Sequence, residues 1–250
     1  MFNKTIIAAL LATVATTATA ADCEYGEHDI TITAADSAVF DLACGGAIKA
    51  IQIFEDDLGY DKLTYTVDVN IEDEVYYLKP GDPDYRVFGI YDTKIKSIQV
   101  SSPTTDYAKE RFVFIADQAD KTTGLAMTDE LWASIVTHEV SHSITDQIWI
   151  DNGGLNRSEK LGGGAQEFVA YIVQLMSLSD ETREQVLNQY PDSNEGFDNK
   201  MKLNSLYHMH FPHKYGVIAY NTFTATGTAW IQEIMNGDLD PDLKFTNGTY

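Results

Sequence analysis

The chain has 250 residues and carries 38 acidic against 17 basic side chains, which gives a formal net charge of −21 at pH 7. A surface this acidic repels nucleic acid and anionic lipid, so we expect neither among its partners. After the N-terminal segment, no stretch approaches the roughly 18 uninterrupted apolar residues that a membrane span requires. The length suits one domain with a sizeable core.

Residues 1–20 have the pattern of a secretory signal peptide. Lys4 provides the positive start, a short apolar run follows, and Ala18 and Ala20 are the small residues that a signal peptidase accepts. We predict cleavage after Ala20, which leaves a single domain over residues 21–250 in the periplasm or outside the cell. The sequence gives no information on the oligomeric state.

The chain has two cysteines, Cys23 and Cys44. In an oxidising compartment an even pair of cysteines favours one disulfide over two free thiols or two metal ligands. We expect this bond to tie the new N-terminus to the start of the first helix.

The first half of the mature chain is predicted to be rich in strands. Apolar and polar residues alternate, as in half-buried strands, over residues 28–32, 62–71, 74–78, 86–91, 94–100 and 111–115. The strands at 86–91 and 94–100 are expected to form a hairpin around Asp92 and Thr93. One helix interrupts this pattern, because apolar residues recur every three or four positions over residues 46–58 and Gly59 can cap its end.

From about residue 127 the pattern becomes helical. Thr128 is a good N-cap for a helix over residues 129–148, a Gly-rich loop is expected over 151–164, and further helices are predicted over 165–178, 181–189, 201–207 and 228–235. The expected fold is therefore α+β and zincin-like, with a β-rich lobe (about 21–118) packed on a helical half (about 127–250). One edge strand is expected to form a wall of the cleft.

The strongest functional signal is an HExxH motif in the middle of the 129–148 helix. His138 and His142 lie one helical turn apart on the same face, so both imidazoles can bind one metal ion. Glu139 points about 100° away around the helix axis, where it can accept a proton from a water at the metal's open position. The alternative is a pair of buried, hydrogen-bonded core histidines.

A catalytic zinc usually takes three protein ligands, so a third ligand is needed. A histidine six residues after His142 would mark another class of zincin, but Ile148 occupies that position. The next helix offers Glu167, which follows His142 by 25 residues. That interval leaves room for a glycine-rich reversal of the chain. The alternative for Glu167 is a solvated carboxylate in a first helical turn.

The HExxH motif followed by Glu167 in a Glu-x-x-Ala-Tyr sequence resembles the gluzincin metallopeptidases. Signal peptide, disulfide and β-rich lobe also resemble small exported bacterial metallopeptidases of poorly defined function. The resemblance over residues 128–171 implies one zinc ion on His138, His142 and Glu167, a peptide or protein substrate, and Glu139 as catalytic base. Gluzincins with an Asp four residues after the ligand Glu use it to support the ligands. This chain departs from that pattern with Tyr171.

Three further histidines cluster near the C-terminal end, at positions 208, 210 and 213. Zincins stabilise the developing oxyanion with a His or Tyr that is not a metal ligand, and His213 and Tyr215 are the candidates here. The alternative is aromatic packing beside a surface histidine cluster. His28 is expected to be structural.

These features together predict an exported zinc metallopeptidase that hydrolyses peptide bonds through a zinc-activated water. The rival hypothesis is an exported metal-containing binding module without turnover. Glu139 argues against the rival, because a purely structural site fills its fourth position with another ligand and has no use for a base.

Overall fold

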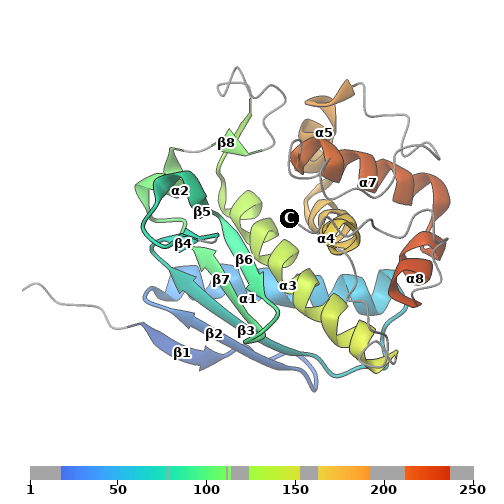
Figure 1. Cartoon of the computed structure of the whole chain (residues 1–250), viewed down its shortest axis with the longest axis horizontal. Helices are drawn as coiled ribbons and strands as arrows, with labels where there is room; N and C mark the ends of the chain where they lie inside the picture. The colour runs from blue at the N-terminus through green and yellow to red at the C-terminus, as the bar shows by residue number, and fades with distance from the viewer. Residues whose placement is uncertain are drawn as a thin grey trace, which may run out of the picture.

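The computed structural model describes residues 18–77, 79–110, 112–113, 124–152, 163–191 and 212–236. These segments form a mixed sheet with helices packed on one face (Figure 1). Helices α1 and α3 contact both the sheet and each other, α4 packs on α3, and α7 packs on α4. The predicted α+β class, with strands in the first half and helices in the second, is confirmed.

The main sheet has five strands in the order β1-β2-β3-β7-β6. Their bounds are Thr19–Asp22, Asp29–Ala34, Thr66–Glu72, Ser97–Ser101 and Gly89–Asp92. The three central strands run parallel, and β1 and β6 are antiparallel edge strands. Helix α1 (Ser37–Gln52) makes the crossover from β2 to β3, as parallel strands require. The predicted hairpin around Asp92 and Thr93 is confirmed as β6 and β7.

Several short elements lie outside this five-stranded sheet. Two-residue strands pair antiparallel as β4 (Val75–Tyr76) with β5 (Arg86–Val87), and as β8 (Phe112–Val113) with β9 (Leu125–Ala126). A 3-10 turn spans Pro83–Tyr85, and α2 spans Asp106–Lys109. Strand β1 was not predicted, since it begins inside the expected signal peptide, whose residues 1–17 lie outside the described part of the chain.

Helix α1 begins nine residues earlier than predicted. Asp36 caps it by accepting hydrogen bonds from the backbone of Ala38 and Val39, and a π-helix (Ile53–Asp57) continues it. The predicted helix began at residue 46, whereas Gly46 lies inside α1 and serves its packing on α3. A Cβ at Gly46 would lie 2.6 Å from the carbonyl oxygen of Ala133, so only glycine permits this close approach.

Residues 37–57 are long and apolar enough to cross a membrane, with a mean hydropathy of 1.4. Their buried face, however, joins the core cluster that also contains residues of the sheet, α3 and α4. This is the arrangement of a core helix in a folded domain.

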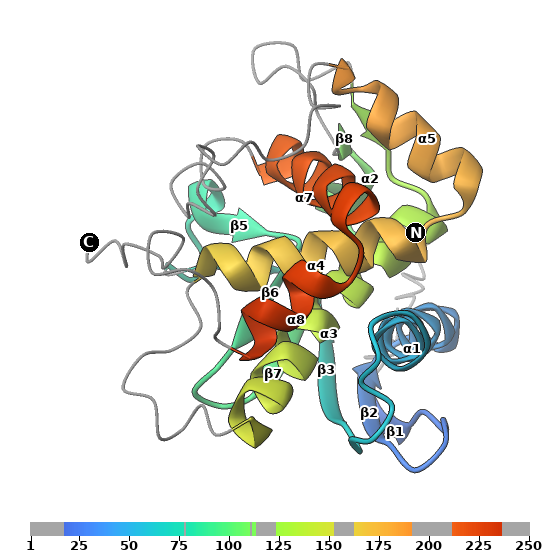
Figure 2. The same cartoon turned by 90° about the vertical axis from the view of Figure 1, so that its right-hand side faces the viewer.

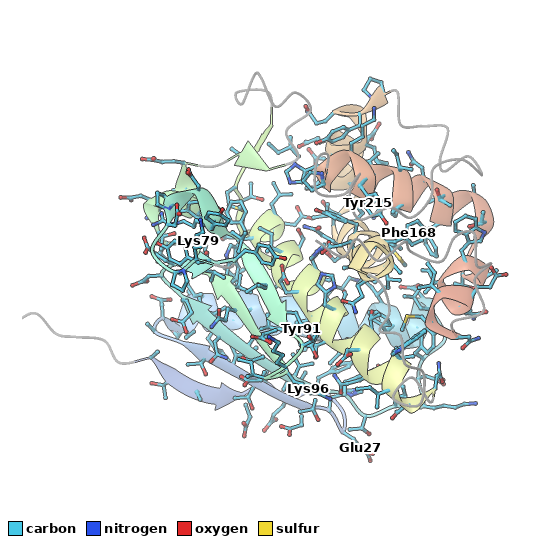
Figure 3. All side chains as sticks on the ribbon, viewed as in Figure 1. Glu27, Lys79, Tyr91, Lys96, Phe168 and Tyr215 are labelled. Carbon is cyan, nitrogen blue, oxygen red and sulfur yellow. A yellow bond between two sulfur atoms is a disulfide. The ribbon has the colours of Figure 1, made fainter. Side chains whose placement is uncertain are left out.

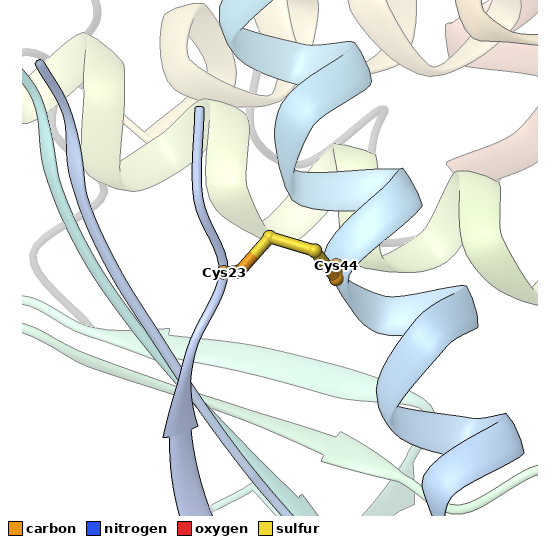
Figure 4. The surroundings of a disulfide bond; sticks show 2 residues. All are labelled: Cys23 and Cys44. Carbon is orange, nitrogen blue, oxygen red and sulfur yellow. A yellow bond between two sulfur atoms is a disulfide. The ribbon is translucent and has the colours of Figure 1, made fainter. Parts of the chain in front are cut away.

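The predicted disulfide is confirmed. Cys23 and Cys44 are bonded, with their Cα atoms 5.7 Å apart (Figure 4). The bond reaches the middle of α1 rather than its start, because the helix begins at Ser37. It therefore fastens the segment between β1 and β2 to the helix that covers the sheet.

Loss of this disulfide is expected to lower the free energy of unfolding by roughly 3 kcal/mol. The bond closes a loop with a sequence separation of 21 residues, and the chain entropy that such a loop removes from the unfolded state sets this magnitude. Denaturant titration of Cys23→Ser/Cys44→Ser against the wild type measures it. Alkylation of two thiols in unreduced native protein would contradict the pairing itself.

In the helical half, three predicted helices are present with nearly the predicted bounds. Helix α3 spans Asp129–Asp151 with Thr128 as N-cap, α4 spans Gly163–Ser177, and α5 spans Asp180–Asn188. The predicted C-terminal helix is α8 (Ala229–Asn236). Helix α7 (Pro212–Thr226), which lies alongside α4 in Figure 2, was not predicted. The predicted 201–207 helix and most of the 151–164 loop lie outside the described residues.

Candidate metal centre

Helices α3 and α4 bring the three predicted metal ligands together. Nε2 of His138 lies 3.3 Å from Oε2 of Glu167, and Nε2 of His142 lies 3.6 Å from Oε1 of the same carboxylate. The ligand atoms of all three residues lie within 4.8 Å of one another. This group could hold a metal ion, as the sequence predicted.

The spacing of these atoms fits a tetrahedral ion. Zinc binds imidazole nitrogen and carboxylate oxygen at about 2.0–2.1 Å, so the ligand atoms at two corners of a tetrahedron lie about 3.3–3.4 Å apart. The separations of 3.3 Å from Oε2 of Glu167 to His138 and of 3.6 Å from Oε1 to His142 are close to this value, each from a different carboxylate oxygen. Both imidazoles are at least nine-tenths buried, whereas the Glu167 side chain is 23% exposed.

The two helices run antiparallel, and this arrangement sets the register of the ligands. Glu167 meets His142, Tyr171 meets His138, and farther along α4 Gln174 meets Ser134. The two histidines therefore lie on the face of α3 that packs on α4, and Glu167 lies on the face of α4 that packs on α3.

The ionisable groups of the centre perturb one another. Burial lowers the pKa of His138, but hydrogen bonding and charge attraction from Glu167, with smaller contributions from Glu139 and Gln174, raise it above its usual value. Burial raises the pKa of Glu139 to about 7, and the charge of Glu167 acts in the same direction. The charge of His138 and the backbone N–H of Tyr91 oppose this shift.

Glu139 lies directly against the edge strand β6. A Cβ at Gly89 would be 2.5 Å from Cγ and 2.6 Å from Oε1 of Glu139, so the carboxylate packs on bare backbone. Two residues along the strand, the Tyr91 side chain also faces α3, and its hydroxyl hydrogen-bonds Asp146 at 3.1 Å (Figure 3). Sequence patterns gave no signal for this contact, because it joins elements fifty residues apart in the chain.

Beside Glu139, some backbone hydrogen-bonding groups of β6 point away from the rest of the sheet. Ser101 N donates to the carbonyl oxygen of Phe88, so the backbone hydrogen-bonding groups of Phe88 point toward β7. In an antiparallel pair the pairing direction alternates, so Gly89 and Tyr91 direct their backbone groups away from β7. The Tyr91 N–H interacts there with Glu139. The edge strand β6 therefore lies beside the predicted base, and its part in a substrate cleft stays a prediction.

Replacing Gly89 by Ala is expected to displace the Glu139 carboxylate while leaving the metal ligands in place. The added methyl group overlaps Glu139 at 2.5–2.8 Å, closer than Cβ atoms approach other atoms. If the predicted peptidase function holds, its rate should fall by about 10- to 100-fold, because a small misplacement of a catalytic group has costs of this order. Zinc content, measured by atomic spectroscopy, should remain stoichiometric.

Gly45→Ala is the matched control, since nothing lies within 4 Å of a Cβ at that helical position. It should keep full activity and gain a little stability, because alanine is the better helix former. An active Gly89→Ala variant would show that the position of Glu139 beside β6 does not matter.

A small pocket of about 150 Å³ opens at this centre. Its lining combines apolar side chains with candidate chemical groups: Phe88, Gly89, Leu131, Ile135, His138, Glu139, Tyr171, Gln174 and His213. Of the two candidates for oxyanion stabilisation, His213 therefore lies at the pocket. His208 and His210 lie outside the described residues.

Tyr215 has a different position from the one predicted. Its side chain is fully buried (Figure 3), and its hydroxyl donates to the carbonyl oxygen of Gly164 at the start of α4, 2.5 Å away. It anchors α7 to α4 and does not line the pocket. Burial raises its pKa well above the usual value.

Tyr171 packs on His138, the first candidate metal ligand. Its ring lies edge-on to His138, with 4.6 Å between the ring centroids. Gly216 of α7 backs the Tyr171 ring so closely that a Cβ there would lie 2.5 Å from it. The Tyr171 ring therefore lies between Gly216 of α7 and the imidazole of His138, and its contact restricts the orientation of that imidazole.

His28 is structural, as predicted. Its ring stacks between Tyr25 and Tyr65 at centroid distances of 5.5 and 5.4 Å. The Tyr65 backbone N–H donates to Nδ1, so Nε2 carries the proton that is shared with Glu55 at 3.0 Å.

Comparison with known protein families gives a match over most of the chain. A family model described as a family of unknown function, DUF6639, matches residues 30–244, which is most of the chain. No curated protein and no solved structure matches.

Proposed function

Because the chain belongs to the DUF6639 family, whose function is unknown, we propose a function from its site: an exported zinc-dependent metallopeptidase. One observation carries the proposal. Ligand atoms of two histidines and one glutamate lie within 4.8 Å of one another, beside a buried carboxylate that is not among them and that packs against the edge strand β6. A structural metal site needs neither the additional carboxylate nor the open edge.

The ligand chemistry favours zinc. Two imidazoles and one carboxylate with a fourth position open are a common set for catalytic zinc, whereas magnesium and calcium prefer oxygen ligands alone. A zinc ion bound here would lower the pKa of a water molecule and polarise a substrate carbonyl.

The residues of the chain would then perform the proton transfers. Glu139 accepts a proton from the attacking water at its carboxylate and returns it to the leaving amine nitrogen. Its burial suits this task, because burial raises the pKa of a carboxylate toward the range in which a base can both accept and release a proton at neutral pH. His213 is the described candidate for donating a hydrogen bond to the developing oxyanion.

The surroundings of Glu139 favour a peptide as substrate. An extended peptide can add to the edge of β6 through the backbone groups of Gly89 and the carbonyl oxygen of Tyr91, whose N–H already interacts with Glu139. Phe88, Leu131 and Ile135 give the adjoining pocket an apolar wall, so a bound peptide would place an apolar side chain there.

Export is the remaining part of the proposal. The Cys23–Cys44 disulfide is compatible with an extracellular location, because disulfides persist in oxidising compartments. Together with the expected signal peptide, it supports a periplasmic or secreted protein.

The decisive experiment combines metal analysis of the purified mature protein with a cleavage screen on casein and on a peptide library. We expect one zinc per chain and cleavage next to apolar residues, abolished by chelation and restored by zinc. Stoichiometric metal without cleavage of any library member would favour the rival, a binding module without turnover. Cleavage that survives complete removal of the metal would refute the mechanism.

A further inference from the structure

The Nδ1 atom of His138 needs a hydrogen-bond acceptor once Nε2 binds a metal. The atom is buried and has no hydrogen-bond partner in the part of the chain that the structure describes. When Nε2 is a ligand, the proton of the neutral imidazole resides on Nδ1, and ligating histidines almost always donate it to a protein acceptor or water. The edge-on ring of Tyr171 fixes the imidazole plane but supplies no lone pair.

Gln174 is a buried polar residue at the same pocket. It is only 5% exposed and lines the pocket together with His138. It lies seven residues after Glu167 on α4, two helical turns along the same face. A buried amide in a largely apolar helix face costs free energy unless its hydrogen bonds are made.

Ser134 determines which way the Gln174 amide points. The Ser134 hydroxyl donates its single proton to the carbonyl of Leu131 at 2.7 Å, so it can only accept from Gln174, whose Nε2 lies 3.2 Å away. The amide nitrogen therefore faces Ser134, and the amide oxygen faces away from it. His138 is one turn after Ser134 on the same face of α3, lines the same pocket as Gln174 and interacts with its side chain.

We propose that Gln174 is a positioning residue of the metal centre, whose amide oxygen accepts the Nδ1 proton of His138 when Nε2 binds the metal. Ser134 holds the amide in the required orientation. The inference rests on the metal centre of the proposed function and is independent of hydrolysis. It assigns this role to a neutral amide seven residues beyond the ligand glutamate, where no motif predicted a functional residue.

The test is the zinc affinity of Gln174→Met, measured by competition with a chelator at fixed pH. Methionine keeps the length of the side chain but cannot accept the proton, and loss of such a partner typically weakens metal binding about 10- to 100-fold. Gln174→Glu keeps an acceptor oxygen, so its zinc affinity should stay within about threefold of the wild type.

Gln147→Met is the matched control on α3. The Gln147 amide bonds the backbone N and O of Thr66, both at 2.9 Å, so its loss should lower the melting temperature of the apo protein without changing zinc affinity. A second readout is the nitrogen NMR spectrum of the zinc-loaded protein. The Nδ1–H signal of His138 should be protected from exchange in the wild type and should exchange rapidly in Gln174→Met.

The outcomes separate this inference from the proposed function. A wild-type protein that binds no stoichiometric zinc would refute the metal centre. A zinc-binding wild type with unchanged affinity in folded Gln174→Met would overturn only the role of Gln174. If that variant does not fold, Ser134→Ala decides: it should weaken zinc binding several-fold by releasing the amide, and unchanged affinity would overturn the proposal.

Discussion

Glu139→Gln is expected to lower the rate of peptide hydrolysis by at least about 100-fold, the usual scale for loss of a general base. The amide keeps the size of the side chain and its place on α3 but cannot accept a proton from water. Zinc content and melting temperature should stay near wild type, because Glu139 is assigned no bond to the metal. Burial already disfavours its charged form, so a neutral amide should be tolerated there.

His138→Ala provides the contrast to this variant. It removes a ligand, so zinc and activity should be lost together. A Glu139→Gln protein that retains most of the wild-type rate would show that the proton-transfer role is wrong. If it lost its zinc instead, Glu139 would be structural, and the binding-module hypothesis would be the better account.

Glu167→Ala is expected to weaken zinc binding by orders of magnitude and to abolish hydrolysis. The carboxylate lies 3.3 and 3.6 Å from the two imidazoles and supplies the only ligand atom from α4 within the described group. Its removal leaves two histidines, fewer than the three protein ligands that catalytic zinc requires. Isothermal titration of the apo protein with zinc measures the loss.

Glu184→Ala is the control for this variant, because Glu184 is an exposed glutamate on the neighbouring helix α5. It should bind zinc like the wild type. Nanomolar, stoichiometric zinc in Glu167→Ala would mean that the third ligand is another residue. His213, which lines the same pocket, would be the first to test.

The metal centre could be predicted from the sequence because its information is local. The spacing of His138 and His142 needs only helical periodicity, and Glu167 lies in the first turns of the next strongly periodic helix. Thr128 marked the start of α3 correctly. The antiparallel packing of α3 on α4 then converts these local patterns into one site.

Residues whose roles depend on tertiary contacts could not be found in this way. Nothing in the sequence distinguishes Gly89 from any other residue of a short strand. Only the fold shows that Glu139 occupies the space where a side chain at position 89 would lie. Gln174 similarly resembles any polar residue of a helix until Ser134 and His138 are placed beside it.

The start of the first helix was predicted wrongly. Apolar periodicity gave a helix from residue 46, whereas Gly46 lies inside α1 and allows its backbone to touch α3. Helix α7 was not predicted at all. Five consecutive residues, Tyr215 to Ala219, are buried, so the helix has no polar face in that stretch to reveal its period.

The antiparallel contact of α3 and α4 means that a bound ion would act as a second cross-link in the molecule. The disulfide is a covalent link between α1 and the segment before β2. The ion would link α3 to α4 to an extent that depends on the free zinc concentration. At a free zinc concentration 100 times the dissociation constant, the added free energy of unfolding is about 2.7 kcal/mol, similar to the contribution of a disulfide. The heat resistance of this protein would then depend on the free zinc concentration around it.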